Sequence, residues 1–212
     1  MITIQIADRL ALLSIEADGR NALSVADMRC LAAYLGQTDE VDGYILYGIG
    51  RSFSSGLALQ TGENVPNVDE QFKDLGAALE ELLDAIISCP RPVVAAVSGH
   101  AIGAGLLMMA AADHVLALDN PKAKFGLPEV RLDVHITPLM ARVLRKRFEE
   151  KHILRMLTAE GFCSLDVLVG WDVLDAEPFD SEEALLAAAR AYLLRLQSHT
   201  ASFARCKTAL VR

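Results

Sequence analysis

The segment from His100 to Asp113 constrains the fold more than any other part of this 212-residue chain. Small residues at Gly103, Ala104 and Gly105 lead into an uninterrupted apolar block, directly after the strand-like run Pro92–Val97. This order predicts a turn that leads into a buried helix of an α/β fold. The apolar run is too short to cross a bilayer, which requires about 20 residues.

The turn before this helix has the chemistry of an anion site. Gly103 and Gly105 lack a β-carbon and Ala104 carries only a methyl group, so a ligand can approach the backbone closely. The first amides of a helix have no intrahelical partner and lie at the positive end of its dipole. They can bind an anion or a developing oxyanion. The alternative is that the small residues only allow the helix to pack tightly, and this stretch alone leaves both interpretations open.

Composition limits the class of protein. Hydrophobic residues make up 52% of the chain and charged residues 23%, which is typical of a globular domain. The formal net charge of -8 argues against general affinity for nucleic acid or an anionic membrane. Residues 1–6 alternate like a strand and do not resemble a signal peptide. The four cysteines form no C-x-x-C pair, so we expect reduced thiols, a cytoplasmic protein and no metal site.

Local patterns predict several elements in the first half of the chain. Residues 2–6 and 10–15 read as a hairpin of two strands. Ser24 is expected to cap a helix over residues 25–35, with Asp27 as the acid of a capping box and Gly36 as the stop. Further elements expected are a buried strand over 43–48, a ligand-binding loop over 50–56, a surface loop over 62–69, a helix ending before Cys89, and a strand over 114–118.

The second half is expected to be mainly helical. Pro128 restricts Leu127 to extended geometry and leaves Glu129 near the start of a new segment. Thr137 and Pro138 read as the N-cap and first residue of a helix whose later turns carry Arg142, Arg145, Lys146 and Arg147. Such a basic cluster is either a solvated face or a contact to phosphates. Helical patterns also cover residues 152–157, 164–170 and 181–199.

Four separated motifs together resemble the crotonase superfamily, also called the enoyl-CoA hydratase/isomerase family. Asn21–Ser24 resembles its N-A-L-[ST] signature, and Phe53–Gly56 resembles F-[SA]-[AS]-G, its first oxyanion-hole loop. Val94–Gly105 resembles the second oxyanion-hole segment, and Phe125–Glu129 matches F-G-x-P-E. The resemblance covers roughly residues 1–175.

The resemblance implies a spiral of repeated ββα units over residues 1–175, followed by a helical segment over 176–212 that is shorter than usual for the family. It also implies an acyl-CoA substrate, with coenzyme A as part of the substrate rather than a separate cofactor, and assembly as a homotrimer or hexamer. Position by position, the amides of Ser55 and Ala104 would bind the thioester oxygen. The resemblance further implies substrate contacts at Phe53, Gly56, Gly103, Gly105 and Leu107.

Departures from the family pattern bear on the reaction. Leu107 stands where typical hydratases carry their first glutamate, and Glu129 occupies the position of the second. One carboxylate can still move a proton from the α-carbon to the γ-carbon of an enoyl thioester, so we expect an enoyl-CoA isomerase with Glu129 as base and acid. Alternatives are a hydratase, an acyl-CoA decarboxylase or hydrolase, or a non-catalytic CoA-binding or assembly subunit. Ala104 in place of glycine and Ala58 in place of aspartate are further departures.

Overall fold

The computed structural model describes residues 1–59, 68–158 and 162–211, which form an α/β fold with two sheets. Within these residues the chain repeats a strand–strand–helix unit, as the resemblance implied. The units are β1 (Ile2–Ala7), β2 (Leu10–Ile15) and α1 (Val25–Leu35); β3 (Gly43–Gly48), β4 (Ser52–Ser54) and α2 (Val68–Ser88); β5 (Val93–Val97), β6 (His100–Ile102) and α3 (Ala104–Ala111); and β7 (His114–Ala117), β8 (Phe125–Gly126) and α4 (Pro138–Arg147).

The remaining helices follow η1 (Glu129–Leu132), which lies between β8 and α4. They are α5 (Glu150–Thr158), α6 (Leu165–Gly170), α7 (Glu182–Leu196), η2 (Gln197–His199) and α8 (Thr200–Val211). Sequence patterns predicted helix over residues 181–199 but did not extend it to α8. No helix in the described ranges combines the length and the apolar composition that crossing a membrane requires.

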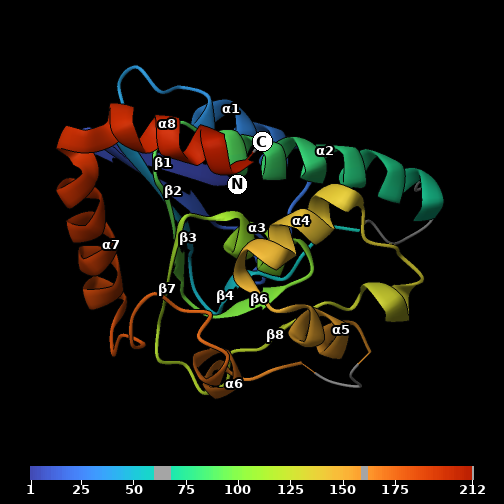
Figure 1. Cartoon of the computed structure of the whole chain (residues 1–212). Coiled ribbons are helices and arrows are strands. Elements are labelled where there is room, and N and C mark those ends of the chain that lie inside the picture. Colours follow the sequence, from blue (N-terminus) through green and yellow to red (C-terminus); the bar gives the residue numbers. More distant parts are fainter. Residues whose placement is uncertain (60–67, 159–161, 212) are drawn as a thin grey trace.

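The larger sheet has the strand order β1-β2-β3-β5-β7. Only β1 and β2 pair antiparallel, through the predicted hairpin, whose turn residues Asp8 and Arg9 both have positive φ. The other pairs are parallel, with Leu12 beside Ile45 and Ala95 beside Val115. Because parallel strands need helical crossovers, both faces of this sheet are covered (Figure 1).

Alternating side chains assign the two faces of the larger sheet to different helices. Leu12, Ile45 and Val94 face α7, which buries Leu185 and Leu193 against them. The opposite face packs against α1, α2 and α3 and forms the larger core. The helical C-terminal segment therefore covers one sheet face directly, as Figure 1 shows for α7 in orange-red.

The smaller sheet pairs β4, β6 and β8, all parallel. Two expectations need correction here. Residues 50–56 contain the short strand β4 in addition to loop, and the segment predicted as turn and helix from His100 begins with β6, so α3 starts only at Ala104. Strands this short form because a neighbouring backbone offers hydrogen bonds, and a local pattern carries no signal of that neighbour.

Local capping signals fixed several helix ends as predicted. Ser24 and Asp27 form a reciprocal capping box on α1, and the Thr137 hydroxyl accepts the Met140 amide at the start of α4. Helix α2 ends at Ser88, before Cys89. Residues 62–67 of the predicted surface loop lie outside the described residues, and Val68 and Asp69 belong to α2.

Candidate functional site

The first turn of α3 borders an apolar cavity of about 120 Å³. The cavity also touches the loop after β4, the 3-10 helix η1, and helices α2 and α4. Its apolar walls come from Leu57, Leu59, Phe72, Leu79, Leu107, Pro128, Leu132, Val134 and Met140. Of the described residues that line the cavity, Glu129 alone has an ionisable side chain.

The turn before α3 presents backbone to this cavity. Gly103 has φ 54° and ψ -119°, a conformation that side chains disfavour, and no side chain caps the helix. The Gly103 amide donates to the carbonyl of Gly126 at 2.9 Å, and the next helical bond runs from the Leu107 amide to the Gly103 carbonyl at 3.0 Å. No hydrogen bond within the described residues uses the amide of Ala104. This amide therefore has no acceptor among the described residues, and Ala104 lines the cavity.

The predicted role of the Ser55 amide needs correction. This amide donates to the carbonyl of Arg20 at 3.1 Å, so it is already engaged. The Gly56 amide is also occupied, by the hydroxyl of Ser54 at 3.2 Å. Family spacing located a loop that borders the cavity, because Ser55 and Gly56 both line it, but the amide that it selected is bonded to the carbonyl of Arg20.

The amide of Leu57, the residue after Gly56, points away from the segment that bonds its neighbours. Leu23 donates to the Gly56 carbonyl at 2.8 Å and accepts from the Ala58 amide at 2.9 Å. Leu23 thus bonds both neighbours of Leu57 in a parallel bridge, which turns the amide of Leu57 to the other side. That amide has no acceptor among the described residues, and Leu57 lines the cavity.

Gly56 brings the two free amides together. Its φ is +104°, and a β-carbon there would lie 3.2 Å from the Ile102 carbonyl oxygen and 3.8 Å from the Ala104 amide nitrogen. A side chain at residue 56 would therefore intrude between the β4 loop and the start of α3. The glycine allows the approach that places the Leu57 and Ala104 backbones around one cavity.

Asn21 supports the β4 loop, a role that the sequence motif did not reveal. Its buried side-chain amide donates to the carbonyls of Ile49, at 3.0 Å, and Ser52, at 2.6 Å, and its oxygen accepts the Ala17 amide at 2.9 Å. The residue lies outside the cavity lining. Asn21 in the N-A-L-S motif therefore orients the loop rather than a ligand.

Glu129 completes the site from the first turn of η1. A β-carbon at Gly103 would lie 3.4 Å from its Oε1, so the carboxyl group faces the turn that carries the Ala104 amide. Its Oε2 is buried and has no hydrogen-bond partner among the described residues. Because burial in apolar surroundings disfavours the charged form, the pKa of Glu129 is raised to about 7. At neutral pH the group is therefore able both to accept and to return a proton.

Two predicted substrate contacts lie elsewhere. Phe53 is fully buried in the main core and does not line the cavity. Gly105 lies against β4, where a β-carbon would fall well inside contact distance of the Ser54 carbonyl, so it serves the packing of α3 on that strand. Ser55, Gly56, Gly103, Ala104, Leu107 and Glu129 do meet at the cavity. His100 and His135, which lie near the motifs in the sequence, do not line it.

Comparisons with known proteins identify relatives of this chain. The family model described as enoyl-CoA hydratase/isomerase matches residues 10–211. A probable enoyl-CoA hydratase of Mycobacterium tuberculosis is 34% identical over 128 residues, covering 57% of this chain and 46% of the relative. One of Bacillus subtilis is 33% identical over 136 residues, covering 63% and 52%. The matched region spans about half the length of these curated relatives.

Solved structures show the same fold over nearly the whole chain. A family protein from Silicibacter pomeroyi has a TM-score of 0.84 at 23% identity and covers 100% of this chain and 89% of its own. An enoyl-CoA hydratase of Mycobacterium smegmatis has a TM-score of 0.83 at 22% identity, covering 98% and 80%. With the family model matched from β2 to α8, the chain belongs to the enoyl-CoA hydratase/isomerase family.

Proposed function

We propose that the protein is an enoyl-CoA isomerase that moves a double bond through a thioester enolate. The observation that carries the proposal is the composition of the cavity. One carboxyl group, Glu129, lies among apolar walls and beside two backbone amides that lack acceptors among the described residues, those of Leu57 and Ala104. Two donors and one base are the groups that proton transfer next to a thioester carbonyl requires.

The proposed reaction begins with ionised Glu129, which removes a proton from the α-carbon of a 3-enoyl thioester. The electrons of the broken C–H bond delocalise onto the thioester oxygen, where the amides of Leu57 and Ala104 stabilise the negative charge. Protonated Glu129 then returns the proton to the γ-carbon, and the enolate collapses to the 2-enoyl thioester. The amides accelerate this step because the enolate oxygen carries more charge than the ground-state carbonyl.

Leu107 favours isomerisation over hydration. It lines the cavity with 1% of its surface exposed, and by the family resemblance it stands where hydratases carry the first of their two glutamates. Hydration has to add a hydroxyl group at one carbon and a proton at the next, which two carboxylates perform readily. With Glu129 as the single ionisable group among the described lining residues, internal proton transfer is the simpler reaction.

Hydration is the second candidate, because the relatives from M. tuberculosis and B. subtilis are named probable enoyl-CoA hydratases. Purified protein incubated separately with 3-enoyl-CoA and 2-enoyl-CoA distinguishes the two reactions. We expect double-bond migration and little hydration. Hydration of 2-enoyl-CoA without migration would reject the isomerase in favour of the hydratase.

The remaining family expectations are also proposals. Assembly as a homotrimer or hexamer is tested by light scattering after gel filtration. A requirement for coenzyme A in the substrate is tested by comparing the acyl-CoA with a short acyl thioester. The cytoplasmic location and the lack of a separate cofactor stay predictions.

A further inference from the structure

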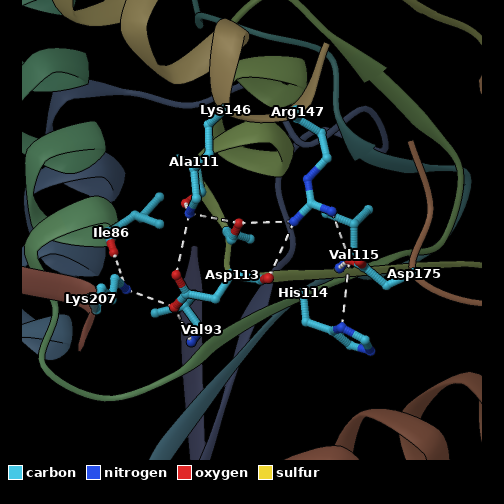
Figure 2. A network of polar contacts seen from close by, with 11 residues as sticks. Ile86, Val93, Ala111, Asp113, His114, Val115, Lys146, Arg147, Asp175 and Lys207 are labelled. Atoms are coloured by element: carbon cyan, nitrogen blue, oxygen red, sulfur yellow. Dashed lines mark hydrogen bonds and ion pairs between the residues drawn. The ribbon is translucent and has the colours of Figure 1, made fainter. Parts of the chain in front are cut away.

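The carboxyl-terminal end of α3 is held by a polar network that we call the α3 clamp: Asp113, Lys146, Arg147, Asp175 and Lys207 (Figure 2). Lys146 donates to the carbonyls of Ala111, at 2.7 Å, and Ala112, at 3.0 Å. Arg147 donates to the carbonyls of Ala112 and Asp113, at 3.3 and 3.2 Å. Two residues of the basic cluster of α4 are thus bonded to backbone carbonyls at the end of α3.

Asp113 is the centre of the clamp. Its Oδ2 accepts from the Lys207 ammonium at 2.6 Å and from the Val93 amide at 3.0 Å, while its Oδ1 lies 3.2 Å from Lys146 Nζ. Lys207 is 7% exposed and also donates to the Ile86 carbonyl at 3.0 Å. One lysine of α8 therefore joins the end of α2 to the end of α3 and, through Asp113, to strand β5.

The net positive charge of the clamp is of the sign that stabilises the carboxyl-terminal end of a helix. Lys146, Arg147 and Lys207 face two carboxylates, Asp113 and Asp175, so positive charge is in excess. The carbonyl end of a helix carries the negative pole of its dipole, which this excess stabilises. The opposite end of the same helix presents the Ala104 amide, whose dipole has the sign that stabilises an oxyanion.

Two kinds of contact hold helix α3, apolar packing along its length and the clamp at its carboxyl-terminal end. All its residues from Ala104 to Ala111 are buried and none is polar, so packing alone acts along its length. A helix of this length spans about 12 Å, so movement at Asp113 is transmitted to Ala104. Helix α4 links the same two regions, since Met140 lines the cavity and Lys146 and Arg147 belong to the clamp.

We propose that Lys207 is a positioning residue for the reaction at Glu129. By holding Asp113, Lys207 of α8 fixes the axial position of α3 and so the Ala104 amide relative to the carboxyl group of Glu129. This inference rests on the proposed function, because it assigns Lys207 an effect on enolate stabilisation. A purely structural lysine would alter thermal stability without altering turnover of the folded protein.

The test compares Lys207→Met with Lys151→Met, which removes the same charge from an exposed pair with Glu149. Both variants are assayed with 3-enoyl-CoA at a temperature where circular dichroism shows them folded. For Lys207→Met we expect kcat to fall about tenfold, with KM changed less than twofold, because small misplacement of a donor acts mainly on the transition state. Lys151→Met should behave as the wild type. Lys207→Arg, which retains the charge and donors, should recover at least part of the lost kcat.

Hydrogen exchange of the full chain provides a readout independent of turnover. Peptides covering residues 103–112 should exchange faster in Lys207→Met, while peptides covering β1 and β2 should not change. Lys207→Gln serves in place of the methionine variant if that variant does not fold. A lower melting temperature with wild-type kcat, or with unchanged exchange around Ala104, overturns the inference. If the wild type moves no double bond, the isomerase proposal fails and the exchange comparison still decides whether Lys207 positions α3.

Discussion

At its amino-terminal end, helix α3 leaves the Ala104 amide and the nearby Glu129 Oε2 without partners among the described residues. At its carboxyl-terminal end, the carbonyls of Ala111 and Ala112 and the carboxylate of Asp113 all accept hydrogen bonds from cationic side chains. Both ends lie in the same core. The difference supports the site that we propose at the amino-terminal end, because unpaired buried polar groups are costly and are rare without a functional reason.

The same distinction separates two partly buried acids, Glu129 and Asp113. Glu129 is surrounded by apolar side chains, and its raised pKa reflects burial without a compensating cation. Asp113 is within hydrogen-bond distance of two ammonium groups and one amide. Replacing each carboxylate by its amide should therefore change the free energy of unfolding in opposite directions. At Glu129 the substitution removes a charge that destabilises the fold, and at Asp113 it removes a charge that pairs with buried cations.

Glu129→Gln is expected to have the largest effect on activity. The amide cannot accept the α-proton, so kcat for double-bond migration should fall by about 10²- to 10⁴-fold, the usual contribution of a general base. In the wild type, the rate should rise with pH as Glu129 ionises around pH 7. Steady-state assays from pH 5.5 to 9 measure both effects. Full isomerase activity in the variant would remove Glu129 from its proposed role.

The same variant should be more stable than the wild type at alkaline pH. The pKa of Glu129 is about 7 in the folded state and has an ordinary value of 4.5. The stabilisation from the protonated carboxyl group is therefore fully present below pH 4.5 and is lost as pH rises through 7. Urea unfolding should show no difference near pH 4 and a gain on the order of 3 kcal/mol at pH 8 for Glu129→Gln. Equal stability at both pH values would mean that the carboxyl group is solvated.

Asp113→Asn tests the carboxyl-terminal end of α3 and should lower the free energy of unfolding, where Glu129→Gln raises it. Removing one partner leaves the ammonium of Lys207 buried and uncompensated, and breaking a buried pair typically costs about 3–5 kcal/mol. Urea unfolding at pH 8 compares this variant directly with Glu129→Gln. A destabilisation below about 1 kcal/mol would show that the clamp is loosely held.

Gly103→Ala should have a smaller effect. The left-handed φ of Gly103 disfavours a side chain by about 1–2 kcal/mol, and the added methyl group would lie 3.4 Å from Glu129 Oε1. Gly76→Ala is the matched control, because Gly76 lies within α2 with open space around it, and alanine there should add about 0.5–1 kcal/mol of stability. Thermal unfolding of both variants measures the contrast. Equal shifts in the two would show that the turn carries no special constraint.

Arg29→Gln should have the smallest effect. Arg29 and Glu81 form an ion pair at 3.2 Å, but both side chains are more than half exposed, at 56% and 53%. Exposed pairs contribute about 0–1 kcal/mol, so we expect a change below about 0.5 kcal/mol in urea unfolding. If Arg29→Gln lowered the free energy of unfolding as much as Asp113→Asn, burial could not explain why the clamp stabilises the fold.

Much of the fold follows from local sequence. The capping box at Ser24, the Thr137–Pro138 helix start and the hairpin at Asp8–Arg9 form as predicted, because each depends on residues only a few positions apart. Local patterns missed strand β4 and helix α8, although the family resemblance implied a helical segment over residues 176–212. Strand β4 pairs with β6, almost fifty positions away in the sequence, and α8 packs on α2 through Lys207.

The motifs predicted which segments form the candidate site, and the structure corrected which backbone amide faces the cavity. The motifs located Glu129, the Gly103–Ala104 turn and the β4 loop, all of which meet at the cavity. They assigned the second oxyanion donor to Ser55, whose amide is bonded to the Arg20 carbonyl. A motif marks which loop reaches a site, but the direction of each amide depends on hydrogen bonds to another segment, here Leu23.

The sequence by itself determined the family and the presence of a single glutamate where hydratases carry two, since these depend on residue identity and spacing, and the strand–strand–helix repeat followed from the resemblance. Only the tertiary structure decided that Glu129 is desolvated, that Leu57 rather than Ser55 offers a free amide, and that Lys207 reaches Asp113. The physical reason is that burial, amide direction and charge pairing are properties of neighbours in space, and those neighbours lie far apart in the chain.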